Sequence, residues 1–245
     1  MQAETVVLET PAESPQFFAQ SAMIMAAIVL LSFPLTYYLP VATASRQFHL
    51  LHHVHGITCF AWFGLYVWQT RLVASGRIAR HREIGLMGFA LTAAIIPLGF
   101  WMAQRAAEVR MADGAARPYE FTWFNVVDIS LFAALMLASI ALVTRHKEWH
   151  KRLTYAAAVS LVAPAATRWT LRVPYLDPFV LDLVAYLVVV PLLVALVLHD
   201  RRTFGKLHPA PLASIAVRLP LQLSSPWVAR TDWWNTVAPG LIGSP

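Results

Sequence analysis

Long apolar segments separated by polar turns run along most of this 245-residue chain. Six of these segments approach the roughly 20 residues that a helix needs to cross the hydrocarbon core of a bilayer. We place them at 21–38, 51–73, 84–103, 121–143, 153–171 and 178–198. Most of the turns between them are short, and short turns make successive helices antiparallel neighbours. The pattern therefore predicts an all-α, polytopic transmembrane bundle of about six spans over residues 21–200.

The two ends of the chain lie outside this predicted bundle. Residues 1–20 are polar and slightly acidic, and we interpret them as a cytoplasmic tail. Residues 201–245 form a C-terminal basic and interfacial segment. Its apolar stretch at 210–228 is interrupted by Arg218 and two prolines, so we expect it to be re-entrant or to lie at the interface rather than to form a seventh span. Three tryptophans would then lie at headgroup depth: Trp227, Trp233 and Trp234.

Composition supports a membrane protein, because 58% of the residues are hydrophobic and only 13% are charged. The net charge of +6 comes from basic turns. With the N-terminus inside, the inner flanks of the spans hold eleven Lys and Arg and the outer flanks hold six. This bias predicts that both termini are cytoplasmic. We expect the basic turns to contact anionic lipid headgroups, and we do not expect nucleic acid to bind.

Two histidines begin spans that are predicted to start at the same, inner side. His81 is followed on its own helical face by Gly85 and Gly88, and His150 by Thr154 and Ala157. A flat macrocycle between two helices needs an imidazole from each side and small residues beside it. One haem b between the third and fifth spans is therefore a hypothesis, with four cations near its propionates: Arg80, Arg82, Lys151 and Arg152. Alternatively, both histidines mark the membrane interface and the glycines allow close helix packing.

The outer end of the second span carries four histidines in seven residues, from His49 to His55. Imidazole is the commonest protein ligand for zinc, copper and iron, so an outer metal site is a second hypothesis. Its ligands would be His52, His53, His55 and, from the fourth span, Asp128. The alternative is structural: Asp128 and Asp182 pair with Arg168 or Arg172, and the histidines are solvated. The single cysteine, Cys59, excludes an internal disulfide and is interpreted as core packing.

Several motifs between His49 and Pro209 resemble those of a group of bacterial polytopic inner-membrane proteins without an established activity. They are His53-Val54-His55-Gly56, Arg80-His81-Arg82, Trp149-His150-Lys151-Arg152 and the segment from Asp200 to Pro209. This resemblance implies a multi-pass protein of the bacterial inner membrane.

A looser resemblance is to the six-helix, ascorbate-reducible cytochrome b proteins, in which histidines on four central helices bind two haems. His81 and His150 match the inner pair, but the fourth span offers Asn125 and Asp128 in place of an outer histidine. The resemblance therefore implies at most one well-ligated haem and membrane electron transfer.

A weaker resemblance is to membrane-embedded zinc hydrolases of the ceramidase type, which combine histidines from several helices with an aspartate. Three functions follow as expectations: a redox protein with one haem b, a metal-dependent hydrolase that uses the outer cluster, and a non-catalytic scaffold or accessory subunit of a membrane complex. The sequence does not decide whether the chain is an enzyme.

Overall fold

The computed structural model describes residues 15–170, 177–184 and 186–243, and this part of the chain forms helices joined by turns, with no strand. Seven helices within it are long: α1 (Pro15–Leu31), α3 (Leu50–Ala74), α4 (Ile78–Ala112), α5 (Thr122–Leu142), α6 (Lys147–Thr170), α8 (Tyr186–Phe204) and α9 (Pro209–Ala229). The short elements are the π-helix η1 (Pro34–Tyr38), α2 (Leu39–Ala42), α7 (Pro178–Val184) and α10 (Asp232–Ile242).

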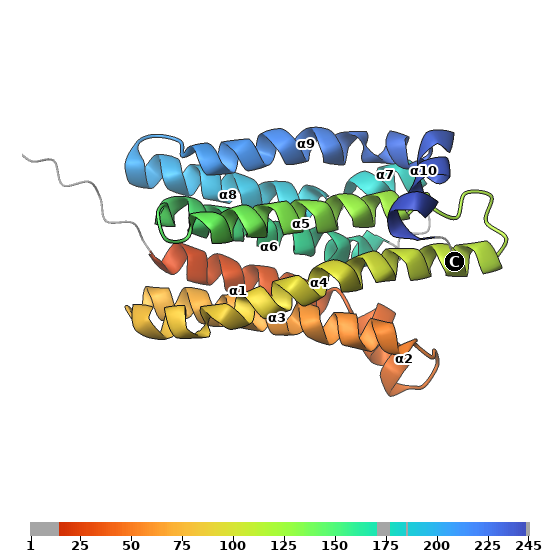
Figure 1. The fold of residues 1–245 in the computed structure, drawn as a ribbon, viewed down its shortest axis with the longest axis horizontal. Coiled ribbons are helices and arrows are strands. Elements are labelled where there is room, and N and C mark those ends of the chain that lie inside the picture. Colours follow the sequence, from red (N-terminus) through yellow and green to blue (C-terminus); the bar gives the residue numbers. More distant parts are fainter. Residues whose placement is uncertain (1–14, 171–176, 185, 244–245) are drawn as a thin grey trace, which may run out of the picture.

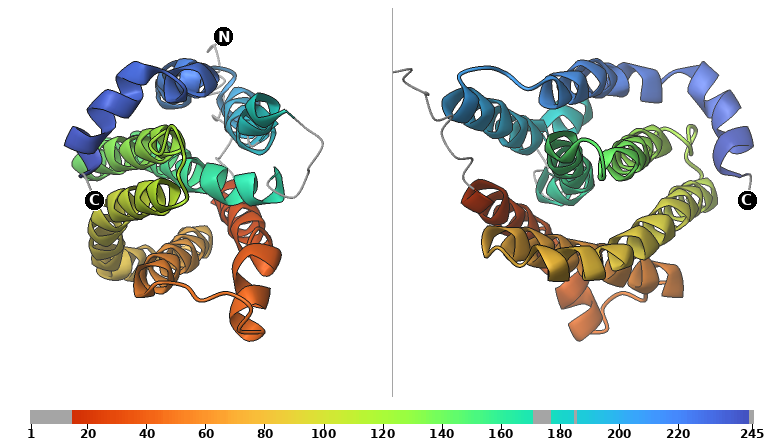
Figure 2. Two further views of the ribbon diagram at one scale, coloured as in Figure 1. Left: turned by 90° about the vertical axis from the view of Figure 1, so that its right-hand side faces the viewer. Right: turned by 60° about the vertical axis from the view of Figure 1, so that its left-hand side comes forward.

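The long helices lie side by side along one axis, as Figure 1 shows. Helix α6 is the central one, because it packs against α1, α5, α8 and α9. In the view along the bundle, its neighbours surround it (Figure 2, left). Its residues from Tyr155 to Val159 have no solvent-accessible surface. Three consecutive alanines in this stretch, 156–158, let the neighbouring helices approach closely, as small residues do in membrane bundles.

Four helical segments within the described residues are long and apolar enough to cross a bilayer: Pro15–Ala42, Ile78–Ala112, Thr122–Leu142 and Phe179–Phe204. Helices α3, α6 and α9 are also at least 21 residues long but do not combine that length with an apolar stretch poor enough in charges. Large apolar side chains on the outside of the bundle are strongly exposed, among them Leu50, Leu86 and Leu187 at 71%, 74% and 71%. An apolar exterior of this kind suits lipid better than water and suggests a membrane protein.

Helix α4 is longer than the predicted third span, which ended at residue 103. It continues to Ala112 through part of the region predicted as a loop. The reason is tertiary packing: Ala103 and Ala107 are fully buried in a small second core with Trp234 and Ala238 of α10. The outer extension of α4 is therefore held by the last helix of the chain.

The C-terminal segment also differs from the expectation. Residues 209–229 form one continuous helix, α9, that packs against α5, α6 and α8. Both internal prolines are accommodated within it. Of the three tryptophans expected at headgroup depth, Trp234 is buried and its Nε1 donates to the Tyr119 carbonyl at 2.9 Å. Trp227 and Trp233 remain exposed.

The direction of α9 bears on the topology of the chain. The basic turns that follow α3, α5 and α8 lie at one end of the bundle, where α1 begins, whereas α10 lies at the other end (Figure 1). The names inner end and outer end below refer only to these two ends of the bundle. The sequence predicted both termini on one side. If α9 crosses the bilayer beside α8, as its packing indicates, α10 lies on the side opposite the N-terminal tail.

We therefore expect a reporter fused after residue 245 to report the side opposite the basic turns. A reporter fused after Lys206, before α9, should report the side of those turns. Paired fusions of alkaline phosphatase and green fluorescent protein, expressed in a bacterial inner membrane, measure this. Equal signals from both positions would show that α9 does not cross the membrane.

Candidate functional site

Helix α9 buries a polar face and exposes an apolar one. Its polar face consists of side chains spaced four, four and three residues apart, all at most 5% exposed: Ser214, Arg218, Gln222 and Ser225. The other side of the helix presents strongly exposed apolar residues, including Val217, Leu223 and Trp227. A helix in water has the opposite arrangement. This pattern is typical of a membrane helix whose polar groups face the interior of a bundle.

Arg218 lies at the centre of this polar face and is 1% exposed. Its Nη2 donates to the Ala156 carbonyl at 3.2 Å and to the Ser160 hydroxyl, both on α6. Its Nε and Nη1 are buried and have no hydrogen-bond partner among the described residues. Because a buried donor without an acceptor costs about 1–3 kcal/mol, the two unused nitrogens favour binding of an acceptor group.

Asp128 of α5 faces the same point from the opposite helix. It lies within electrostatic range of Arg218 and beside the Gln222 amide, and Tyr186 of α8 is near it. In the described part of the chain, however, no direct ion pair joins Asp128 and Arg218. The Gln222 Nε2 is also buried and has no hydrogen bond of good geometry. Two unused guanidinium nitrogens, the Gln222 amide and the Asp128 carboxylate therefore come together between α5, α6, α8 and α9.

This central cluster is closed on the outer side by fixed polar contacts. Trp123 Nε1 donates to the Ser225 hydroxyl at 3.0 Å, and that hydroxyl donates to the Leu221 carbonyl at 2.6 Å. Farther out, Arg230 forms ion pairs with Asp182 at 2.8 Å and Glu120 at 3.3 Å. Asp182 was expected to pair with Arg168 or Arg172. Its observed partner is Arg230, because α9 and not α6 supplies the nearest cation.

The inner side is closed by a buried ion pair between α6 and α8. Arg152 and Asp200 both have fully buried side chains, and three contacts of 2.6–3.1 Å join the guanidinium to the carboxylate. The Arg152 Nη1 also donates to the Glu148 carboxylate at 2.6 Å. Glu148 in turn pairs with Lys151 at 2.7 Å. This network uses two of the four cations that the sequence assigned to haem propionates.

His81 and His150 lie at the same end of the bundle, close enough to affect each other electrostatically, although no direct contact between them is found among the described residues. His150 Nδ1 contacts the Ser139 hydroxyl at 2.8 Å and the Ser139 carbonyl at 3.2 Å. The Gln69 amide lies against His81, oriented so that its nitrogen donates to His81 Nδ1. A Cβ added at Gly85 would meet no atom within 4 Å, so this glycine does not serve close helix packing.

A haem fits this pair only in part. An imidazole that binds iron through Nε2 carries its proton on Nδ1, and a hydrogen bond from Nδ1–H holds the ring in place. For His81 this would require the Gln69 amide to turn over, so that its oxygen rather than its nitrogen faces Nδ1. The cations are also engaged with acids: Arg80 pairs with Glu83 at 2.7 Å, and Arg152 and Lys151 pair as described. Arg82 is exposed, and within the described residues it forms no ion pair. The imidazole pair is in place, whereas most of the expected propionate partners are not free.

The outer histidines are separated from Asp128. His53 Nδ1 contacts the Tyr37 hydroxyl of η1, and His52 Nδ1 lies 3.3 Å from the His49 carbonyl. His55 Nε2 lies 3.7 Å from the Cys59 sulfur, with Arg168 nearby. Within the described residues, no three His, Cys, Asp or Glu side chains are grouped so that they could hold a metal ion. The structure therefore does not assemble the proposed set of His52, His53, His55 and Asp128.

Arg168 of α6, proposed as a partner for the aspartates, instead stacks over the Phe33 ring at 4.3 Å, and its Nη1 donates to the Pro164 carbonyl. Arg172 lies outside the described residues.

At the inner end, His208 caps α9 by accepting a hydrogen bond from the Ala210 amide at 3.1 Å, and burial lowers the pKa of its imidazole.

The central cluster contains residues that the sequence did not assign to a site: Ser160, Tyr186, Arg218, Gln222 and Ser225. A signal was present, since the polar residues of 210–228 recur at helical spacing. Arg218 was interpreted as a break in an apolar segment rather than as part of a stripe. No protein-family model, curated protein or solved structure matches this chain. The site is therefore interpreted from its own chemistry.

The inner ion pair yields a stability prediction. Replacing Asp200 by Asn should lower the free energy of unfolding by about 3–5 kcal/mol, because Arg152 would lose its fully buried counter-charge. Replacing Glu83 by Gln removes an exposed pair and should cost at most about 1 kcal/mol. Thermal unfolding of detergent-purified variants measures both. Similar midpoints for the two variants would contradict the assigned importance of the buried pair.

Proposed function

We propose that this chain is an integral membrane protein that binds a small anion at Arg218 and takes up a proton on Asp128 at the same time. The observation that carries the proposal is that Arg218 is buried with two unused donor nitrogens and no direct ion pair to Asp128. The chemistry is that of proton-coupled anion binding, the step on which proton-coupled anion transport depends.

The coupling follows from charge balance in a medium of low dielectric constant. A net charge buried among apolar helices is costly, so the site is most stable when its total charge is close to zero. Without a ligand, ionised Asp128 offsets the Arg218 cation. When an anion occupies the unused donors, protonation of Asp128 restores neutrality. One proton therefore enters with each monovalent anion.

The geometry favours a carboxylate among small anions. A carboxylate offers several lone pairs, and charge-assisted hydrogen bonds from a guanidinium to carboxylate oxygens are stronger than neutral ones. The Gln222 amide, on the same face of α9 and beside Asp128, supplies a further donor. Tyr186 and Trp123 line the cluster on the α8 and α5 sides. Lipid-facing apolar residues on α9 separate the site from the bilayer.

The test measures acetate binding and proton uptake by calorimetry on purified protein, in buffers of different ionisation enthalpy. We expect one proton per bound acetate, with affinity falling up to about tenfold for each pH unit once Asp128 must be protonated to bind. In Asp128→Asn, acetate should bind without proton uptake and with little dependence on pH. Arg218→Gln should abolish binding.

A control is Arg168→Gln, which removes a half-buried arginine of the bundle outside the cluster. It should leave acetate binding unchanged. Binding that survives Arg218→Gln, or proton uptake that survives Asp128→Asn, would disprove the proposal. Asp128→Asn keeps the shape of the side chain, so it tests the coupling even if Arg218→Gln fails to fold.

A redox function with one haem b is a second candidate, favoured by the meeting of His81 and His150 at one end of the bundle. A bound haem would supply one-electron chemistry, and the two imidazoles would hold its iron. Protein purified after haem-supplemented expression should then show a Soret band and a dithionite-reduced α-band. His81→Ala and His150→Ala should abolish both, whereas His53→Ala should not. Colourless wild-type protein would eliminate this candidate.

A further inference from the structure

Two hollows adjoin each other on the outside of α3 and α4, on a different face from the Arg218 cluster. One, of about 390 Å³, lies at the turn between the helices and is lined by Trp68, Arg71, Leu72, Ala74, Ser75 and Arg77. The other, of about 350 Å³, is lined by Ala61, Leu65, Trp68, Met87, Ala90 and Leu91. Trp68 lines both, so a molecule that passes this side chain would contact a polar hollow and an apolar one; we call the two together the groove.

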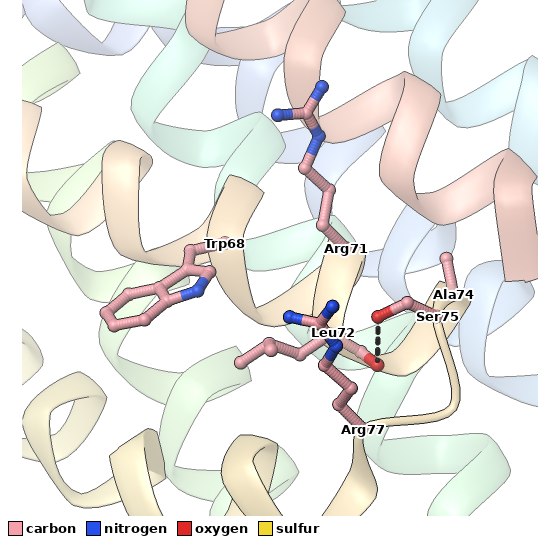
Figure 3. A pocket seen from close by; sticks show the side chains of 6 residues that line it. All are labelled: Trp68, Arg71, Leu72, Ala74, Ser75 and Arg77. Carbon is pink, nitrogen blue, oxygen red and sulfur yellow. Dashed lines mark hydrogen bonds between the residues drawn. The ribbon is translucent and has the colours of Figure 1, made fainter.

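The polar end owes its charge to two arginines. Gly76, with a positive φ of 74°, ends α3 and turns the chain back. In Figure 3 the Arg77 guanidinium lies beside Leu72, and Arg71 extends to the other side. Both arginines are exposed, and within the described residues neither pairs with an acid. The amides of Ser75, Gly76 and Arg77 already donate to backbone carbonyls, so the guanidiniums supply the free donors.

The apolar end follows the helices away from the turn. Ala61 and Ala90 are small and exposed, and larger side chains such as Trp68 and Met87 flank them. Ala61 precedes Arg71 by ten residues, or about 15 Å along the helix, which is half the thickness of a hydrocarbon core. The groove thus spans about one leaflet, with its charges at headgroup depth and Trp68 near the interface.

We propose that this groove binds one anionic phospholipid from the surrounding bilayer. The phosphate binds at Arg77, with the exposed Arg71 side chain turning toward it, and an acyl chain lies along Leu65 and Ala61 between α3 and α4. A soluble anion would use the arginines but would leave the apolar half without a function. The length and open side of that half match an acyl chain, so the structure favours a lipid. The inference does not depend on the proposed anion site at Arg218.

The test is native mass spectrometry of detergent-purified protein titrated with phosphatidylglycerol or phosphatidylcholine of identical acyl chains. We expect one phosphatidylglycerol to be retained in preference to phosphatidylcholine. Each arginine removed should weaken its binding about five-fold, so Arg71→Gln with Arg77→Gln should remove the preference. A matched control, Arg201→Gln with Arg202→Gln, removes two charges from the same end of the bundle and should keep it.

Two further experiments test whether the ligand is a lipid rather than a soluble phosphate. Ala61→Phe fills the apolar half, leaves both arginines in place, and should lower phosphatidylglycerol retention. Glycerol 1-phosphate, which lacks acyl chains, should not displace the lipid at equal concentration. Equal retention by wild type and the Arg71/Arg77 variant would overturn the proposal, as would displacement by glycerol 1-phosphate. Ala61→Phe keeps the test decisive if the double variant unfolds.

Discussion

A charge buried among apolar helices must be matched by an opposite charge or by donors and acceptors, and this constraint organises the bundle. Arg152 and Asp200, both without solvent access, fix α6 to α8 at the inner end. Arg230 with Asp182 and Glu120 fixes α9 to its neighbours at the outer end. Between these two closed networks lies Arg218, whose donors are only partly used. The charged side chains at the two ends have partners and stabilise the structure, whereas the Arg218 donors without partners at the centre mark a candidate site.

The sequence predicts the fold class because a bilayer requires long apolar helices, and the apolar pattern is regular from residue 21 to 198. It fails where tertiary packing decides. The extension of α4 to Ala112 depends on burial of Ala107 against α10, which no local pattern encodes. The sequence did not predict that α9 packs within the bundle, because Arg218 lowers the mean hydropathy of this segment, although the arginine faces inward.

The site could be predicted only in part, for the same reason. The meeting of His81 and His150 follows from topology, since short turns place the starts of alternate spans at one end. Which carboxylate meets which cation depends on helix rotation, and the sequence does not specify rotation. Asp128 was therefore assigned to the outer histidines, whereas it faces Arg218 on a helix that the prediction left out of the bundle.

Helix α9 buries its polar face and exposes its apolar face, and this arrangement also affects how the chain enters a membrane during synthesis. A helix with an arginine near its middle inserts poorly by itself, at a cost of about 2.5–3.5 kcal/mol for that residue on insertion scales. Helix α9 is made after α5 and α6, whose Asp128 and Ser160 face Arg218. Its partners are thus already present when it emerges. If α9 crosses the bilayer, its insertion is therefore an assembly step, completed by earlier helices rather than by its own hydrophobicity.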